Sequence, residues 1–176
     1  SPDRGPGRRH PAGEAQQRRR GGAECRGALD GEQRSGARRI HATGIAIDGF
    51  GVALVGQSGA GKSDLALRLI DRGAVLVCDD AVELFEQSDT LWIGLCPNID
   101  GKIEVRGLGI IATPYIEKAP LRLVVDLDTQ PERYPDPWPV HSLGGFSVPT
   151  LHLDGFEASA PIKIELAVQR LLDQQI

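Results

Sequence analysis

Hydrophobic and polar residues divide the chain into two parts with different patterns. Up to residue 39 the sequence is rich in Arg, Gly, Ala and Gln, and Leu29 is its only large aliphatic residue. Such a stretch buries too little apolar surface to offset the entropy of ordering it, so we expect residues 1–39 to be a disordered extension. From Ile40 onward, short apolar runs alternate with glycine-containing breaks. This pattern predicts one folded domain over residues 40–176.

The first half of this domain has the pattern of strands arranged around a glycine-rich turn and a helix. Strands are expected at 40–47, 51–55 and 74–78, and a helix is expected at 62–72. The dipeptide Asp48-Gly49 favours a hairpin between the first two strands. The predicted helix carries its apolar residues on one face and ends at Gly73. Strand, turn, helix and strand in this order are typical of a βαβ unit.

The second half predicts more strands and a final helix. Short strands are expected at 82–85, 91–95, 102–112 (with a glycine break), 121–127 and 149–153. Four prolines between residues 131 and 139 predict an irregular segment. Apolar residues between Ile164 and Leu172 fall on one helical face, so a C-terminal helix is expected to start near 159–161. The fold class is therefore α/β, with a central mixed sheet, flanking helices and a C-terminal helix.

The glycine-rich turn carries the strongest chemical signal in the sequence. Gly56-Gln57-Ser58-Gly59-Ala60-Gly61-Lys62-Ser63 matches the P-loop pattern G-x-x-x-x-G-K-[ST]. Glycines let consecutive backbone N–H groups turn toward a phosphate chain, and the following helix adds its positive N-terminus. Lys62 is expected to reach the β- and γ-phosphates, and the Ser63 hydroxyl to ligate Mg²⁺. The sequence therefore predicts a P-loop domain that binds a nucleotide and Mg²⁺.

An acidic pair, Asp79-Asp80, follows the strand expected at 74–78. Carboxyl ends of parallel strands face one crevice, so the pair should lie near the γ-phosphate. Two carboxylates at that place can divide two tasks, contact with the metal shell and proton abstraction from an attacking hydroxyl. The structural alternative is that one or both aspartates only cap a turn.

Three further residues carry chemistry that sequence spacing alone leaves open. His41 lies in the first expected strand, where a histidine is more often structural than catalytic. Glu104 and Arg106 are two apart and share one face of a strand, and glycines follow at 107 and 109. They could bind Mg²⁺ and an anion, or form a cross-strand ion pair before a turn.

Charge and composition add limits on compartment and partners. The chain carries a net charge of −4, which divides into +5 for residues 1–39 and −9 for residues 40–176. An acidic domain disfavours nucleic acid as a partner, and no apolar run is long enough to span a bilayer. The three cysteines are widely spaced and odd in number, which favours a reducing, cytoplasmic location.

Taken together, these motifs resemble the catalytic domain of HPr kinase/phosphorylase. This bacterial enzyme phosphorylates a serine of the phosphocarrier HPr of the phosphotransferase system and regulates carbohydrate metabolism. The resemblance spans about residues 40–173 and rests on four segments: IHATG at 40–44, GVALVGQSGAGKSDLALRLIDRG at 51–73, VLVCDD at 75–80 and IEVRGLGII at 103–111. It implies an ATP- and Mg²⁺-dependent serine kinase whose partner is an HPr-like carrier protein.

The resemblance also implies roles for individual residues. His41 matches the family's active-site histidine, and residues 56–63 match its ATP loop. One member of Asp79-Asp80 matches the base for the serine hydroxyl; Asp80 is favoured, and the choice stays open. Glu104 matches a second Mg²⁺ ligand beside Ser63. Arg106 lies in the signature at 103–112 that both reactions of the family share.

The sequence departs from the family pattern in three places. Only 39 residues precede the catalytic part, as in the short single-domain form found in alphaproteobacteria. Glu132-Arg133-Tyr134-Pro135 matches the family's arginine segment in part, which makes Arg133 a candidate catalytic residue. The P-G-R-N motif before the last helix is absent, and Ala158-Ser159-Ala160-Pro161 stands there. We therefore expect forward kinase activity with weak phosphorylase activity, while a homo-oligomer stays open.

Two alternative functions have different consequences. A P-loop kinase for a small metabolite would carry a lid segment rich in arginine, but only Arg122, Arg133 and Arg170 follow Arg106. A non-catalytic ATP-sensing regulator would bind ATP without transferring phosphate to any carrier.

Overall fold

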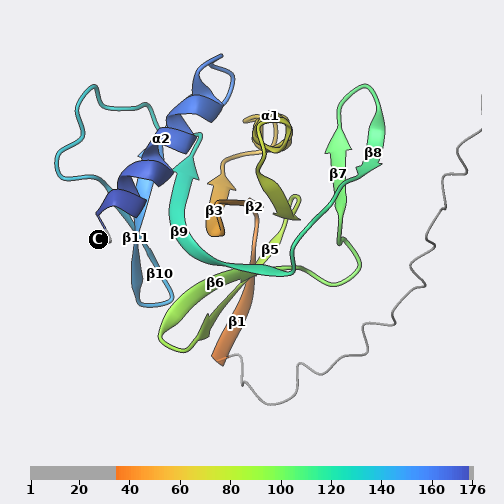
Figure 1. The fold of residues 1–176 in the computed structure, drawn as a ribbon, viewed down its shortest axis with the longest axis horizontal. Helices are drawn as coiled ribbons and strands as arrows, with labels where there is room; N and C mark the ends of the chain where they lie inside the picture. The colour runs from red at the N-terminus through yellow and green to blue at the C-terminus, as the bar shows by residue number, and fades with distance from the viewer. Residues whose placement is uncertain (1–34, 175–176) are drawn as a thin grey trace, which may run out of the picture. The chain divides into compact units, whose positions relative to one another are not determined.

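The computed structural model describes residues 35–174, which contain eleven strands and two helices. The strands are β1 (Ser35–Ile40), β2 (Thr43–Ile47), β3 (Phe50–Val55), β4 (Val75–Cys78), β5 (Val82–Gln87), β6 (Thr90–Gly94), β7 (Lys102–Val105), β8 (Gly109–Ala112), β9 (Lys118–Asp126), β10 (Val140–Leu143) and β11 (Phe146–His152). The helices are α1 (Lys62–Asp71) and α2 (Ala160–Asp173). These elements confirm the expected α/β class with a C-terminal helix (Figure 1).

Nine of the strands form one mixed sheet, in the order β1-β5-β6-β9-β3-β2-β4, with β11 paired to β9 and β10 to β11. Strand β9 joins the two halves of this sheet, because residues 118–120 pair with β6 and residues 121–126 pair with β3. Both helices cover one face of the half that contains β3, while β1, β5 and β6 lie below it (Figure 1). β7 and β8 form a separate two-stranded hairpin.

Successive side chains of β3 point to opposite faces of the sheet, and both faces are buried. Val52 and Leu54 are fully buried in the cluster that contains the helices' apolar residues, such as Leu65 and Ile164. Ala53, between them, is fully buried in a second cluster on the opposite face, which includes residues of β5 and β6. A strand with two buried faces reads as a continuous apolar run, as the sequence 51–55 does.

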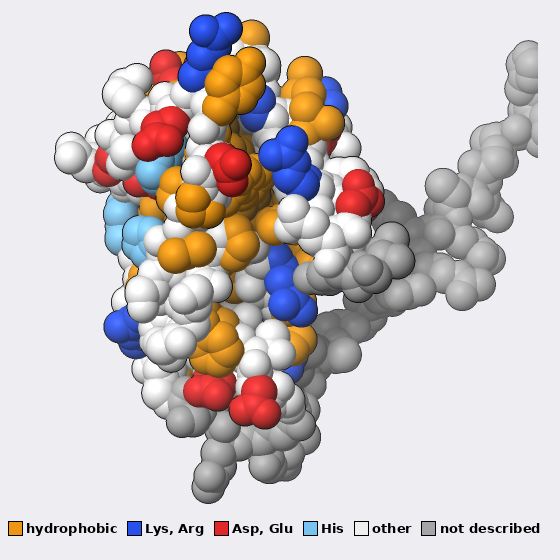
Figure 2. All heavy atoms as spheres, turned by 90° about the vertical axis from the view of Figure 1, so that its left-hand side faces the viewer, with side chains coloured by type: hydrophobic (Ala, Val, Ile, Leu, Met, Phe, Trp, Pro, Cys, Tyr) orange, Lys and Arg blue, Asp and Glu red, His pale blue; other side chains and the backbone are white. Residues whose placement is uncertain are grey.

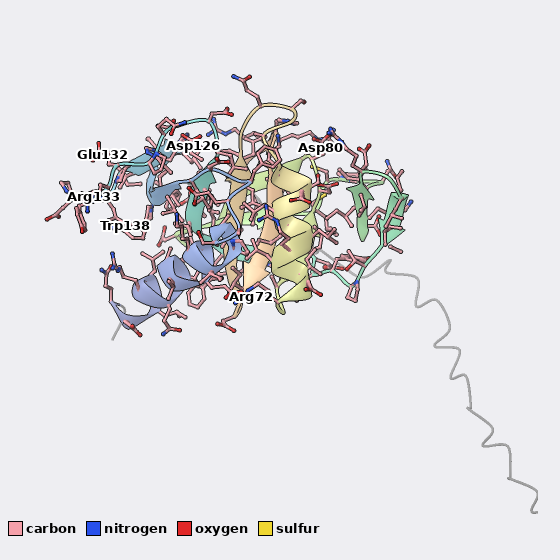
Figure 3. The ribbon with its side chains drawn as sticks, turned by 90° about the horizontal axis from the view of Figure 1, so that it is seen from above. Arg72, Asp80, Asp126, Glu132, Arg133 and Trp138 are labelled. Carbon is pink, nitrogen blue, oxygen red and sulfur yellow. The ribbon has the colours of Figure 1, made fainter. Side chains whose placement is uncertain are left out.

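A bidentate ion pair joins the two helices near the end of α1. Arg72 donates from Nε and Nη2 to the two carboxylate oxygens of Glu165, at 2.7 and 2.8 Å. These hydrogen bonds lower the pKa of Glu165. The pair is partly exposed, so its contribution to stability is modest. Figure 3 shows Arg72 from above, on the helical side of the sheet.

The βαβ unit differs from the expected one in a single respect. β3 and β4 are not neighbours, because β2 lies between them and is antiparallel to both. β3 and β4 therefore still run parallel, and their carboxyl ends reach the same edge of the sheet. Since β2 runs the other way, its first residues also reach that edge. This inserted strand brings residues 41–43 to the P-loop edge.

Several predicted boundaries need correction. The strand expected at 40–47 is interrupted at residues 41–42, and the segment 102–112 is a hairpin of β7 and β8 rather than one strand. β10 was not expected from sequence. Ser35–Arg39 was placed in the disordered extension, but it forms strand β1 together with Ile40 and pairs with β5. Residues 1–34 of that extension lie outside the described residues. Neither described helix is long and apolar enough to cross a membrane.

Strand β1 yields a test of where the folded part begins. The first described element, β1, begins at Ser35, so a variant that begins there should keep its melting temperature. A variant that begins at His41 loses the pairs from Arg38 to Ile40 with β5 and leaves the edge of β5 open. We expect its melting temperature to fall by roughly 5 °C or more, since about 1 kcal/mol corresponds to ~2–4 °C in a domain of this size. Equal melting temperatures for both variants, measured by circular dichroism, would show that β1 contributes nothing to the stability of the fold.

Candidate active site

The P-loop connects β3 to α1 at the carboxyl edge of the sheet, as the sequence predicts. Gly59 and Gly61 adopt left-handed φ angles of 86° and 91°, which residues with a Cβ rarely adopt. The Lys62 side chain is 6% exposed, and its ammonium donates to the carbonyls of Gly56 and Gln57 at 2.7 and 3.0 Å. The loop is thus folded around its own lysine. The backbone N–H groups in the first turn of α1 have no partner within the helix and point out of its N-terminal end, where a phosphate can bind.

Asp79 lies at the centre of the hydrogen bonds beside the loop. It is 8% exposed, and its Oδ1 accepts from the Ser63 hydroxyl at 2.8 Å and from the Thr43 hydroxyl at 3.1 Å. Its Oδ2 accepts from the backbone N–H of Glu104 at 3.0 Å. One carboxylate therefore connects β2, α1 and β7. Thr43 had not been singled out from sequence, because nothing in the spacing shows that β2 inserts between β3 and β4.

Asp80 faces solvent beside His41. Its backbone is left-handed, with φ 64°, a conformation that Asp tolerates better than most residues. This conformation turns the Asp80 side chain away from the three partners of Asp79. The Asp80 carboxylate is 77% exposed and lies 3.5 Å from Nδ1 of His41, which is 51% exposed. The two neighbouring aspartates therefore have different environments, one saturated with hydrogen bonds and one open.

Glu104 and Arg106 lie on and just after β7, at the rim of this site. The backbone of Glu104 is fixed by Asp79, while the side chains of Glu104 and Arg106 are exposed. Leu108 and Ile110, at the tip of the same hairpin, are 76% and 73% exposed. The structure brings the signature segment to the acidic pair through the Glu104 backbone. It does not show the Glu104–Arg106 ion pair that was the structural alternative.

Arg133 lies apart from the other candidates. Figure 3 shows Arg133 and Trp138 in the proline-rich segment, well away from Asp80. The Arg133 guanidinium lies over the Tyr134 ring, 5.6 Å from its centroid. This segment, the end of β11 and α2 enclose a groove of about 1090 Å³ that includes no P-loop residue. Figure 2 shows the face, with hydrophobic side chains gathered at a hollow.

A second acidic cluster, missed from sequence, supports the other side of the loop. Asp128 accepts the backbone N–H of Gln57 with both carboxylate oxygens, at 3.1 and 3.0 Å. Asp126 in turn accepts from the Asp128 N–H at 2.9 Å and from the Thr129 hydroxyl at 2.6 Å. Burial alone would raise the pKa of Asp126, but these hydrogen bonds and nearby His152 lower it. A signal was available in the sequence, because Asp126 and Asp128 lie at the carboxyl end of a strand, as Asp79-Asp80 do.

The oxygen donors at this edge suit Mg²⁺ delivered with a nucleotide. Mg²⁺ prefers hydroxyl, carboxylate and phosphate oxygens and retains several waters, so it rarely needs a complete protein cage. The Ser63 hydroxyl next to the Asp79 carboxylate is such a donor set. Within residues 35–174 no group of three His, Cys, Asp or Glu side chains forms a metal site of its own. Most ligands would therefore come from the phosphates and water.

A P-loop and a carboxylate that binds its serine, on parallel strands of a mixed sheet, define a P-loop nucleotide-binding domain. Comparison with known proteins narrows the class. Residues 32–129 match the family model described as "HPr Serine kinase C-terminal domain", which covers more than half of the chain. The chain belongs to this family. The match ends before the proline-rich segment and Arg133.

Curated relatives of the chain carry the name of the same family. The HPr kinase/phosphorylase of Azoarcus sp. (strain BH72) is 43% identical over 111 residues, 57% of this chain and 36% of that protein. The one from Clostridium botulinum (strain Eklund 17B / Type B) is 49% identical over 74 residues, 42% of this chain and 24% of that protein. The chain thus spans about a third or less of these relatives.

The solved structure of the Hpr(Ser) kinase/phosphatase from Coxiella burnetii has a similar fold. It superimposes with a TM-score of 0.68 at 28% sequence identity, over 78% of this chain and 92% of that one. This similarity supports the expected P-loop fold of the HPr kinase catalytic domain.

The Asp128 contact gives a test of how the loop is held. Asp128→Ala removes both acceptors of the Gln57 N–H and leaves the first residue after Gly56 untethered. Because the contact is exposed, we expect a loss of about 1 kcal/mol in the free energy of unfolding, which is the value for an ordinary hydrogen bond rather than for one to a buried charged group. ATP affinity should fall severalfold, as measured by isothermal titration calorimetry. Asp48→Ala, in the β2–β3 turn at the other edge, is the control, and equal ATP affinity in the two variants would contradict the tether.

Proposed function

We propose that this chain is an ATP-dependent serine protein kinase whose acceptor is an HPr-like phosphocarrier of the phosphotransferase system, through which it acts on carbohydrate metabolism. The observation that carries the proposal is the double use of Asp79-Asp80. One carboxylate fixes the Ser63 hydroxyl of the P-loop, and the other faces solvent where an acceptor can approach. Kinases need both functions within reach of the γ-phosphate. The names of the relatives, HPr kinase/phosphorylase, support an HPr-like acceptor.

In this proposal Lys62 and the loop residues 56–63 hold and polarise the phosphates of ATP. A buried ammonium acts on developing charge in a region of low dielectric, so its effect on the barrier is large. Ser63, oriented by Asp79, is the protein's hydroxyl ligand for Mg²⁺, and Glu104 is the candidate for a second ligand. A Mg²⁺ ion held there would supply positive charge to the β- and γ-phosphates.

We assign the proton-accepting role to Asp80 and a positioning role to Asp79. Asp79 already accepts three hydrogen bonds and is buried, whereas Asp80 is open to a serine hydroxyl. His41, 3.5 Å from Asp80, is placed to orient that carboxylate and to bind an incoming proton. Arg106 lies on the exposed hairpin beside the site and is proposed to contact the acceptor or its phosphate. Arg133 keeps no catalytic role in this arrangement, because it lies in the proline-rich segment away from the loop.

We propose that this chain catalyses mainly the forward reaction, phosphoryl transfer from ATP to the serine. In the reverse reaction, inorganic phosphate attacks the phosphoserine, so the site must bind a phosphate ion that has no adenosine to anchor it. Additional positively charged side chains would provide that binding. The segment 154–161, which leads into the first residues of α2, contains no basic residue. The nearest cations are already engaged, since Arg68 donates to the carbonyls of Gly155 and Glu157, and Lys163 pairs with the Glu157 carboxylate.

The direct test is phosphate transfer from labelled ATP to the host's HPr-like proteins. We expect one serine of a carrier to be labelled, and Lys62→Ala to lower the rate about 100- to 1000-fold, the loss typical of removing one charge-stabilising group. Lys118→Ala is the matched control, because Lys118 binds Gln87 at the far end of β9. ATP binding without transfer to any carrier would favour the ATP-sensing regulator. Transfer to a small metabolite instead would favour the metabolite kinase.

The two aspartates should give distinguishable defects. Asp80→Asn should lower kcat about 100-fold or more while KM for ATP stays nearly unchanged, because only proton transfer is lost. Asp79→Asn removes the anion that orients Ser63, so it should raise the Mg²⁺ concentration needed for half-maximal rate. Steady-state kinetics over ATP and Mg²⁺ concentrations separate these outcomes. The assignment is wrong if Asp80→Asn retains kcat while Asp79→Asn abolishes it without a change in Mg²⁺ dependence.

A further inference from the structure

A short turn after β11 lies against the P-loop and carries an exposed aromatic ring. Phe156 is 65% exposed, although it is a large apolar residue beside a phosphate-binding loop. Its ring packs on Gly61, where an added Cβ would lie 3.1 Å from ring atom Cε1 and 3.2 Å from Cζ. Gly155 is equally close to the loop, since a Cβ there would lie 2.8 Å from the carbonyl oxygen of Ala60. The turn and the P-loop thus contact each other without intervening side chains.

This turn is held in place from both sides of Phe156. Arg68, in the last turn of α1, donates to the Glu157 carbonyl at 3.0 Å and to the Gly155 carbonyl. The Phe156 N–H donates to the Asp154 carboxylate at 2.9 Å, and the Glu157 N–H donates to the Asp154 carbonyl at 3.2 Å. An exposed ring on a backbone fixed by four hydrogen bonds is pre-organised, so little entropy is lost when a ligand covers it.

The direction of the phosphate chain sets which end of ATP meets this ring. Ser63 and Asp79 lie on the β2 and β4 side of the loop, so the γ-phosphate and its Mg²⁺ belong there. If the triphosphate lies extended along the loop, its nucleoside end points to the opposite side, toward β9 and β11. Figure 3 shows this polarity, with Asp80 and Asp126 on opposite sides of the loop that follows β3. The turn at 154–157 continues from β11, which pairs with β9 on that side.

We propose that Phe156 is the base-binding residue of this site, on which the adenine ring of ATP stacks. The inference rests on the proposed function, because it requires that ATP binds in the loop. Stacking on an aromatic side chain tolerates any base, since every base presents a π face. The ring therefore supplies affinity for the nucleoside and leaves the chemistry at Ser63, Asp79 and Asp80 unchanged.

The test compares binding of Mg²⁺-ATP with binding of Mg²⁺-tripolyphosphate, a probe that has the phosphates but no base. Phe156→Ala and Phe156→Leu should weaken ATP binding about five- to a hundredfold, the range for loss of one base stack. Both should bind tripolyphosphate as the wild type does. Leu keeps apolar volume against Gly61 without a π face, so it separates stacking from support of the loop. Phe156→Trp should retain ATP affinity.

Fluorescence gives a second readout that a structural role would not move. The wild-type chain has two tryptophans, Trp92 and Trp138, and serves as the background. The tryptophan of the Phe156→Trp variant should be quenched by ATP and unaffected by tripolyphosphate. Equal ATP affinity in Phe156→Ala and wild type would overturn the inference, and so would an equal loss of ATP and tripolyphosphate binding. Base-dependent binding through Phe156 without transfer to a carrier would retain this inference and refute the proposed function.

Discussion

The Asp79 carboxylate is the interaction on which the arrangement of the site depends. It is buried and accepts hydrogen bonds from Thr43 on β2, from Ser63 on α1 and from the Glu104 backbone on β7. A buried charge is tolerated only when it is well paired or hydrogen-bonded, and these three partners stabilise the Asp79 carboxylate in its buried place. The same contacts fix the serine of the P-loop and bring the β7–β8 hairpin to the site. Stability and positioning therefore have one origin.

Around this centre the site divides into two sides of one loop. On the β2 and β4 side lie Asp79, Asp80 and His41, which suits the reacting end of a nucleotide. On the β9 and β11 side lie Asp128, which accepts the backbone N–H of Gln57, and Phe156, which packs on Gly61. The division follows from topology, since β3, β4, β9 and β11 are parallel and end at one edge, and the antiparallel β2 begins there. Most of the groups that we place at the site lie at or just beyond the ends of these strands, while Glu104 and Arg106 come from the β7–β8 hairpin.

Features that depend on local sequence could be predicted well. The P-loop, the helix that follows it and the Asp48-Gly49 hairpin turn were expected where the structure has them, because their glycines and apolar spacing encode backbone conformation directly. Features that depend on long-range pairing could not. The insertion of β2 between β3 and β4 has no local signal, so the Thr43 contact was missed. Ser35–Arg39 looked disordered by composition, yet pairing with β5 makes it a strand. Arg133, proposed from a partial motif, lies in a segment that turns away from the loop.

In the arrangement that we propose, Asp79 organises a P-loop site with a reacting side and a nucleoside side. A crystal structure with Mg²⁺ and a non-hydrolysable ATP analogue tests it most directly. We expect the phosphates within residues 56–63, the metal next to Ser63 on the side of Asp79, and the base on the side of β9 and β11. A nucleotide bound with its base over Asp80, or bound in the groove beside α2 away from the P-loop, would contradict the account.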